Sequence, residues 1–416
     1  FGSSGRGAVG LGAAPLVAMR KLLEPDARDG IGVVALKGAN EGVSGGGRST
    51  KAKLDSVLSR LLEWSNKVTM IISVMVFAHE GLAYNLVFLC RVLPAVGKEE
   101  CVLPFFILFN SAYGLALWSY LRAHLTDPGM LPEQWRDFVS NSGDALPVVP
   151  ALPEWQPGKA TFCTKCFIAR PERAHHCNVC DVCVLRMDHH CPWLDNCIGH
   201  HNHKFFMLLT IYAWLASVVA LATCLPQVVY CAVTLAGIGD RWGEQLGTAD
   251  IVVFLIFIVF ALLVAVLLTQ LLTVHLPHGL RNVTTIEDMY GNMPNPFDQG
   301  GLASNLAQVF GAPGPDWLIP VRPRRPASDG ICFPCSIEHL RLDDCGCAPQ
   351  LWPTEVLSRP EQERTWRHRY RVRLPDVPDF RAGGGRDVRC GDDWLSNPLA
   401  SSLWGTCMPP RRNIWL

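Results

Sequence analysis

The sequence predicts an α-helical polytopic membrane protein with four transmembrane helices and a cytosolic zinc-binding, cysteine-rich domain between helices two and three. Three observations support this fold class. Hydrophobic residues make up 49% of the 416 residues, and charged residues only 18%. Four apolar windows, at 68–90, 101–121, 205–225 and 251–273, are each long enough to cross a hydrocarbon core of about 30 Å as a helix. A dense run of cysteines and histidines lies between the second and third windows.

The region before the first window, residues 1–66, is predicted to be cytosolic and mostly disordered. Its first 50 residues are rich in glycine, alanine and serine, a composition that buries little apolar surface. This stretch also lacks the apolar core of a signal peptide. Helices one and two are then expected within 67–121, and helices three and four within 205–273.

Basic residues predict the orientation of the four helices. They concentrate between the second and third windows, whereas the other two connections offer only Arg91, Lys98 and Arg241. Because cytosolic loops carry an excess of lysine and arginine, segment 122–204 and both termini are predicted to be cytosolic. A reducing cytosol fits a chain whose seventeen cysteines need not form disulfides.

The cysteine and histidine array leaves one thiol available for chemistry. Eleven residues of ligand type lie between Cys163 and Cys197, and two tetrahedral zinc ions would use eight of them. Cys191 follows directly after Asp188, His189 and His190, which gives it the neighbours that a reactive thiolate requires.

The order and spacing of these residues resemble a known family. The run Cys163-x2-Cys166, His176-Cys177-x2-Cys180-x2-Cys183, Asp188-His189-His190-Cys191 and Cys197 is similar to the cysteine-rich domain of DHHC protein S-acyltransferases, the palmitoyltransferases. Three further family motifs occur at their expected places, Asp127-Pro128-Gly129, Thr284-Thr285-Ile286-Glu287 and Asn295-Pro296-Phe297-Asp298. The resemblance covers roughly residues 67 to 311.

The resemblance implies two interleaved zinc sites. It assigns one ion to Cys163, Cys166, His176 and Cys183. It assigns the other to Cys177, Cys180, His190 and Cys197, and gives His175 no role. Sites closed by three cysteines and one histidine have no open coordination position, so structural zinc is favoured over catalytic zinc.

The resemblance also implies the reaction. Cys191 is expected to accept the acyl group of a long-chain acyl-CoA such as palmitoyl-CoA and to pass it to a protein cysteine, in two ping-pong steps. His189 is the candidate base, and Asp188 is expected to orient its ring. A threonine of the pair Thr284 and Thr285 is expected to contact Asp188, although the sequence leaves open which one. Taken alone, Thr-Thr-x-Glu is typical of a helix cap.

Side chains near the start of the third helix are candidates for an acyl pocket. They are Trp193, Phe206, Leu209, Ala213 and Ala216. The last three follow Phe206 on approximately one helical face, where small residues would leave room for the acyl chain. Small residues also allow close packing of membrane helices, and this alternative stays open. Pro226 is expected to end the third helix.

Two regions follow the fourth helix. Segment 274–311 is predicted to be cytosolic, with a short amphipathic helix whose apolar face holds Leu302, Leu306 and Phe310. Segment 312–416 is a Pro- and Arg-rich tail without periodicity for a second domain. Its cysteines Cys332, Cys335, Cys345 and Cys347 have spacings that fit either a third zinc site or free or acylated thiols in a mobile tail.

The predicted function is that of a protein-cysteine S-palmitoyltransferase of an endomembrane, the Golgi or the ER. Its partners would be acyl-CoA, the bilayer, and cytosolic or membrane proteins with membrane-proximal cysteines. The alternative is a membrane-anchored zinc-ribbon adaptor without catalysis, but an adaptor has no need of Asp188, His189 and a ninth cysteine. A nucleic-acid partner is not expected, because the formal net charge is zero and no basic recognition helix accompanies the cysteines.

Overall fold

The computed structural model describes residues 46–236, 246–291, 293–335 and 358–372. The chain divides into two units, Phe1–Val57 and Leu58–Leu416. Of the first unit, the structure describes the start of helix α2 (Gly46–Leu82), from residue 46 onward. The predictions for residues 1–45, Cys345 and Cys347 lie outside the described residues. The membrane helices and the candidate site belong to the second unit.

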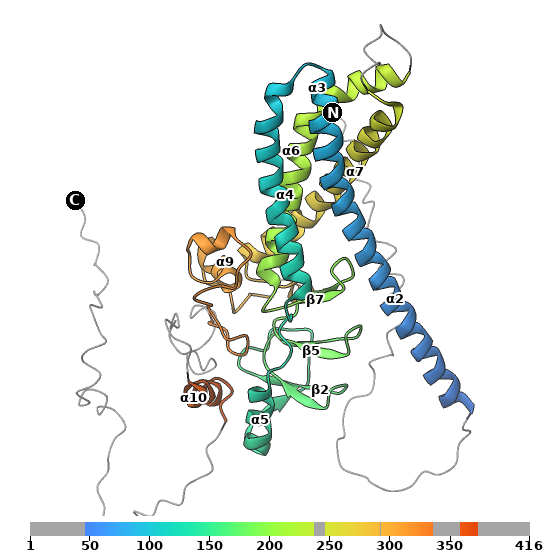
Figure 1. The fold of residues 1–416 in the computed structure, drawn as a ribbon. Helices are drawn as coiled ribbons and strands as arrows, with labels where there is room; N and C mark the ends of the chain where they lie inside the picture. The colour runs from blue at the N-terminus through green and yellow to red at the C-terminus, as the bar shows by residue number, and fades with distance from the viewer. Residues whose placement is uncertain (1–45, 237–245, 292, 336–357, 373–416) are drawn as a thin grey trace, which may run out of the picture. The chain divides into compact units, whose positions relative to one another are not determined.

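Four helices of the described chain are long and apolar enough to cross a membrane, which confirms the predicted number. They span Arg60–Ala95, Glu99–Leu125, His203–Leu235 and Thr248–Leu280. The first consists of α2, the π-helical segment η1 (Ala83–Val92) and α3 (Leu93–Ala95), and the second of η2 (Glu99–Cys101) and α4 (Val102–Leu125). The third is α6 (His203–Leu235) and the fourth α7 (Thr248–Leu280). Figure 1 shows α6 beside α4 and α7, and α6 packs against both.

The prediction that Pro226 ends the third helix is wrong, because α6 continues through it to Leu235. Proline removes one backbone donor, and in a membrane helix neighbouring helices and serine or threonine side chains can satisfy the carbonyl that this frees.

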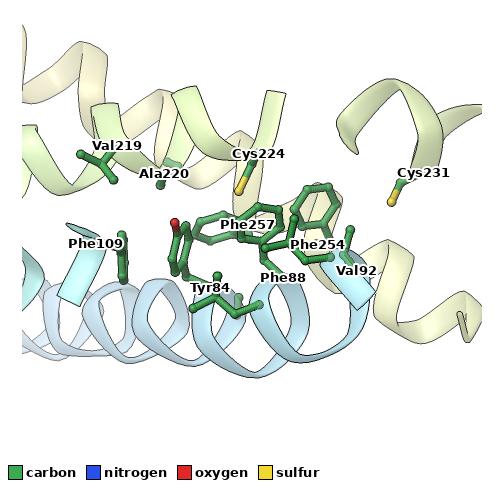
Figure 2. Close-up of a cluster of buried hydrophobic side chains, with 14 of the residues drawn as sticks. Tyr84, Phe88, Val92, Phe109, Val219, Ala220, Cys224, Cys231, Phe254 and Phe257 are labelled. Carbon is green, nitrogen blue, oxygen red and sulfur yellow. The ribbon is translucent and has the colours of Figure 1, made fainter. Parts of the chain in front are cut away.

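Aromatic side chains from three of the helices form the core of the bundle (Figure 2). The ring of Tyr84 stacks on that of Phe109 with 3.8 Å between centroids, and Phe88 stacks on Phe254 at 5.7 Å. The hydroxyl of Tyr84 is 3.0 Å from that of Thr223, so the phenol is hydrogen-bonded inside an apolar cluster. Large buried aromatic surfaces of this kind dominate the packing energy of a core.

The segment between α4 and α6 folds into three small β-hairpins (Figure 1). Strand β1 (Val148–Val149) joins the first hairpin, which consists of β2 (Ala160–Cys163) and β3 (Ile168–Arg170). The second consists of β4 (His175–Cys177) and β5 (Val182–Val184), and the third of β6 (His189–Cys191) and β7 (Asn196–Ile198). Each hairpin turns through a residue with a left-handed backbone: Phe167 (φ 53°), Asp181 (φ 53°) and Asp195 (φ 46°).

The described part of the C-terminal tail packs on these hairpins, which differs from the expectation of a mobile tail. Helix α10 (Arg359–Arg369) buries Trp366 against Trp135 and Phe138 of α5 (Glu133–Ser142), with ring centroids 5.7 and 5.5 Å apart. An ion pair of 2.6 Å joins Arg369 to Glu172, and both side chains are almost fully buried. The cysteine-rich domain therefore shares its hydrophobic core with residues from the end of the chain.

The segment after α7 holds α8 (Thr285–Asp288), α9 (Leu302–Phe310) and η5 (Pro315–Leu318). The predicted amphipathic helix is therefore present as α9. Phe310 is buried against Met207 and Leu208 of α6, and Leu306 is partly buried in the same cluster. Leu302, the third residue of the predicted apolar face, is 65% exposed.

Candidate active site and metal centres

The structure brings the eight predicted zinc ligands together in two groups, each with its ligand atoms within 4.8 Å of one another. The pairing of residues across the hairpins explains how the ligands come together. His176 pairs with Cys183 across the second hairpin, and His190 pairs with Cys197 across the third. The other two ligands of each group come from the turn of the preceding hairpin, so each ion would clamp two successive hairpins together. This accounts for the interleaved order along the chain.

The spacing of the donor atoms fits zinc. A tetrahedral ion with ordinary zinc–sulfur and zinc–nitrogen bonds separates its sulfur ligands by about 3.8 Å, and sulfur from nitrogen by about 3.6 Å. In site one, Nδ1 of His176 lies 3.2, 3.6 and 3.9 Å from the thiols of Cys166, Cys163 and Cys183. In site two, Nδ1 of His190 lies 3.4, 3.7 and 3.8 Å from Cys180, Cys197 and Cys177. Both histidines present the same ring nitrogen to the sulfurs.

Cys191 belongs to neither group, because the third hairpin repeats the first two imperfectly. The first two turns begin with Cys163 and Cys177, and each has a second cysteine three residues later. The third begins with Cys191 at the same register, but Leu194 stands in place of the second cysteine. Leu194 is buried in an apolar cluster with Cys191. The hairpin thus holds a thiol at a ligand position without the partners that would close a metal site.

Asp188 and His189 form a hydrogen-bonded pair beside this thiol. Nδ1 of His189 donates to Oδ2 of Asp188 at 2.6 Å, and the Asp188 side chain is fully buried. Burial opposes ionisation of Asp188, but the hydrogen bond from His189 and the charges of nearby histidines outweigh it and lower the pKa of the carboxyl. Burial likewise opposes charging of His189, but Asp188 and Cys191 outweigh it and raise the pKa of the ring to about 9.

The two threonines after α7 have different partners. Thr285 donates its backbone N–H to Oδ1 of Asp188 at 2.8 Å, and its hydroxyl to Oδ2 at 3.1 Å. Thr284 is the N-cap of α8, and it forms a reciprocal capping box with Glu287. Both interpretations of the motif therefore apply, each to its own threonine.

Sequence reasoning missed His275, which reaches the same carboxylate from α7. Its Nδ1 lies 3.6 Å from Oδ2 of Asp188, and its ring packs edge-on against Phe206 with centroids 4.9 Å apart. The side chain is almost fully buried. A histidine in an apolar helix near a cysteine-rich domain is the signal that was available, but the sequence does not show which residue it would face.

A buried arginine network behind the site was also missed. Arg173 makes two short bonds to the carboxylate of Glu287, at 2.6 and 2.7 Å, and a third to the carbonyl of Asn282 at 2.9 Å. Arg186 donates to Oδ1 of Asn282 at 3.0 Å and lies 2.8 Å from Nδ1 of His203. Charged pairs stay buried only when their hydrogen bonds are satisfied, so this network fixes α8 against the hairpins.

The predicted acyl-pocket residues divide between surface and core. Trp193 is 54% exposed, whereas Phe206 is buried and packs edge-on against His189, with centroids 5.1 Å apart. Leu209 borders the cluster that contains Cys191. Ala213 and Ala216 are buried, and Ala216 belongs to the aromatic core of the bundle.

Of the tail cysteines, the structure describes Cys332 and Cys335. Neither belongs to a group of potential metal ligands within the described residues. Cys335 is buried, and its thiol lies 3.1 Å from the guanidinium of Arg369. His175 likewise lies outside both zinc groups, and burial, with Arg170 nearby, lowers the pKa of its ring to about 4.

Comparisons with known proteins agree with these features. A family model described as DHHC palmitoyltransferase matches residues 156–292. Palmitoyltransferase ZDHHC15A of Danio rerio is 31% identical over 303 residues, which cover 67% of this chain and 87% of the relative. Probable protein S-acyltransferase 13 of Arabidopsis thaliana is 32% identical over 267 residues, 61% of this chain and 86% of the relative. Palmitoyltransferase ZDHHC7 of Mus musculus is 34% identical over 211 residues, 50% and 63% of the two chains.

The zinc-ribbon adaptor is not favoured by these findings, since the relatives are named as acyltransferases. Four membrane helices, two groups of zinc ligands and the extent of the similarity identify the same family. The chain therefore belongs to the DHHC palmitoyltransferase family, and it is a multi-pass membrane protein with protein S-palmitoyltransferase activity.

Proposed function

We propose that Cys191 carries the acyl group between a long-chain acyl-CoA, such as palmitoyl-CoA, and cysteine thiols of cytosolic or membrane proteins. One observation carries the proposal: Cys191 interacts with the His189 ring of the Asp188–His189 pair and lies outside both groups of zinc ligands. A buried carboxylate that accepts from Nδ1 orients the imidazole, and the raised pKa of the ring favours the form in which Nε2 holds a proton taken from a thiol.

The reaction divides into two balanced steps. His189 takes the proton of the Cys191 thiol, and the thiolate attacks the thioester carbonyl. The carbonyl carbon forms a bond to Sγ, the bond to the CoA sulfur breaks, and the CoA thiolate takes the proton from His189. In the second step His189 takes the proton of the substrate thiol, which attacks acyl-Cys191. The new thioester forms, and the Cys191 thiolate leaves and recovers the proton.

The remaining residues hold this arrangement. Both zinc sites are assigned a structural role, because four protein ligands close each of them and leave no position for substrate. Thr285 is assigned the role of fixing Asp188 through two hydrogen bonds. We place the site at the cytosolic face of an endomembrane, the Golgi or the ER, with the acyl chain lying along α6 past Phe206, Leu209 and Ala213. The proposed regions are those defined from the sequence, from segment 1–66 to tail 312–416, except that residues 46–66 of the first segment lie in helix α2.

Self-acylation tests the proposal. Full-length protein purified in detergent is incubated with labelled palmitoyl-CoA, and label that hydroxylamine releases is measured together with the zinc content. Cys191→Ala should abolish the label and keep about two zinc ions, since Cys191 is outside the ligand groups. Cys90→Ala, at an exposed cysteine, is the matched control and should keep both. Label on the Cys191→Ala protein, or loss of an ion from it, would refute the assignment.

A further inference from the structure

Asn66 of α2 reaches the second zinc site from a helix far away in sequence. Its Nδ2 lies 3.1 Å from Nε2 of His190, across 124 positions of the chain. Asn66 is buried, whereas segment 61–65 and Lys67 on either side of it are exposed. Among residues 61–67, Asn66 is thus the one buried position, and its side chain contacts the third hairpin.

The protonation of the two ring nitrogens of His190 determines whether Asn66 must donate or accept a hydrogen bond. Nδ1 of His190 faces the thiols of Cys177, Cys180 and Cys197. An imidazole that binds zinc through Nδ1 is neutral, and its other nitrogen carries the proton and donates it. A side-chain amide exchanges its oxygen and nitrogen by a half-turn, so Asn66 can present Oδ1 as the acceptor at this position.

Site one has an outer partner of a different origin. Nε2 of His176 lies 3.3 Å from Oδ1 of Asp181, which belongs to the turn of the same hairpin and is 87% exposed. The two atoms are close but form no hydrogen bond, and this carboxylate is local to the hairpin and accessible to water. In site two the neighbouring side chain, Asn66, is buried and belongs to a membrane helix. The outer nitrogen of the histidine thus faces a side chain of its own hairpin in site one and a side chain of the first membrane helix in site two.

We propose that Asn66 is the outer hydrogen-bond acceptor of the second zinc site and couples the first membrane helix to the hairpin that carries Cys191. His190 and Cys191 are adjacent residues of β6, so a bond that orients the His190 ring also holds the strand that carries the thiol. This inference rests on the proposed zinc occupancy, and it adds a positioning residue that touches neither the acyl group nor the reacting atoms.

The rate of zinc release tests the coupling. Full-length protein that holds about two zinc ions is mixed with an excess of a chelating indicator dye, and the release of each ion is followed by absorbance. Asn66→Leu removes the acceptor at similar volume, and release of one ion should become about 10-fold faster or more. Asn66→Asp supplies a carboxylate acceptor and should keep the slow rate.

Two controls identify which ion responds. Ser65→Leu places the same apolar side chain at the neighbouring, exposed position and should leave both rates unchanged. Asp181→Gly tolerates the left-handed backbone and removes the carboxylate nearest to His176, so any acceleration that it causes should be confined to the ion of site one.

Three outcomes would overturn the proposal. If the Asn66→Leu protein releases both ions at the parent rate, there is no coupling. Asn66→Asp that releases as fast as Asn66→Leu would show that the side chain is not an acceptor. If the parent protein contains no zinc, the zinc assignment is wrong and the proposed coupling fails with it. This result is distinguishable from a failure of the coupling alone, because it is measured on the parent protein before any variant is made. Asn66→Ala gives a smaller change at the same position if the leucine variant is not recovered.

Discussion

His189 and His190 are adjacent in sequence, yet their rings have different partners. His189 bonds to the buried carboxylate of Asp188, whereas His190 directs Nδ1 at three cysteine sulfurs. In a β-strand, successive side chains point to opposite faces, so one strand serves both the proposed base and the zinc site. The two side chains could exchange roles only if the strand were rotated so that its two faces changed places.

Substitution of each histidine should therefore have a different effect. His189→Ala should slow self-acylation by roughly 10²- to 10⁴-fold, the range for removal of a positioned base, with both zinc ions retained. His190→Ala should lose one ion. Elemental analysis beside the acylation rate checks both, and equal zinc content in the two variants would contradict this division of roles.

The two threonines allow a similar separation. Thr285→Val removes the hydroxyl bond to Asp188 and keeps the backbone bond, so self-acylation should slow by roughly 10-fold, in keeping with about 1.5 kcal/mol for a bond to a charged group. Thr284→Val removes the N-cap of α8 and should lower the free energy of unfolding by about 1 kcal/mol. Initial rates and thermal unfolding of both variants check this. A Thr284 variant slower than the Thr285 variant, with unchanged stability, would contradict it.

At the scale of elements, the third hairpin explains how a ligand-rich domain keeps a free nucleophile. Its turn has the backbone of the two zinc-binding turns, with Asp195 left-handed like Phe167 and Asp181. Leu194 fills the place of the second cysteine with a buried apolar side chain. The fold thus holds the Cys191 thiol in a turn with the backbone of a zinc-binding turn, although this thiol would not bind zinc.

Helix α10 is the element whose loss should be most visible in stability. Trp366→Ala should lower the free energy of unfolding of the cysteine-rich domain by about 3–5 kcal/mol, because the ring is 2% exposed between Trp135 and Phe138. Thermal unfolding monitored by tryptophan fluorescence checks the change. Arg364→Ala, at an exposed position of the same helix, is the matched control and should have little effect. An equal shift in the two variants would mean that α10 does not stabilise the domain.

At the scale of the whole molecule, α6 connects the hairpins to the bundle core, and Ala216 lies along it. On the pocket interpretation, Ala216→Phe should shift preference toward shorter acyl-CoAs, because each excluded methylene forfeits about 0.8 kcal/mol of burial. Competition between C14, C16 and C18 acyl-CoAs for self-acylation measures the shift. Ala222→Phe, at an exposed position of α6, is the control. An unchanged preference in a folded Ala216 variant would assign this residue to helix packing.

The sequence predicted those parts of the molecule that depend on local pattern. Four apolar windows predicted the four membrane helices, and the spacing of cysteines around His176 and His190 predicted which residues gather. Contacts across long sequence separations were not predictable from local pattern, and the contact of Thr285 with Asp188 was expected only from the family resemblance. Asn66, His275 and Trp366 contact partners that lie 124, 87 and 231 residues away in the sequence (190 − 66, 275 − 188 and 366 − 135), and nothing in their neighbouring residues marks those partners.

The packing of α10 on the hairpins also has a consequence for synthesis. A nascent chain can insert its four helices and present all eight zinc ligands once residue 280 has emerged from the ribosome. Its cysteine-rich domain nevertheless lacks Trp366 and Tyr370, which complete the hydrophobic core around Trp135. Because apolar surface exposed during synthesis is prone to misassembly, the hairpins depend on the last turn of α10 to complete their burial. A transcript that ends before residue 359 would encode every proposed catalytic residue on a domain with an open core.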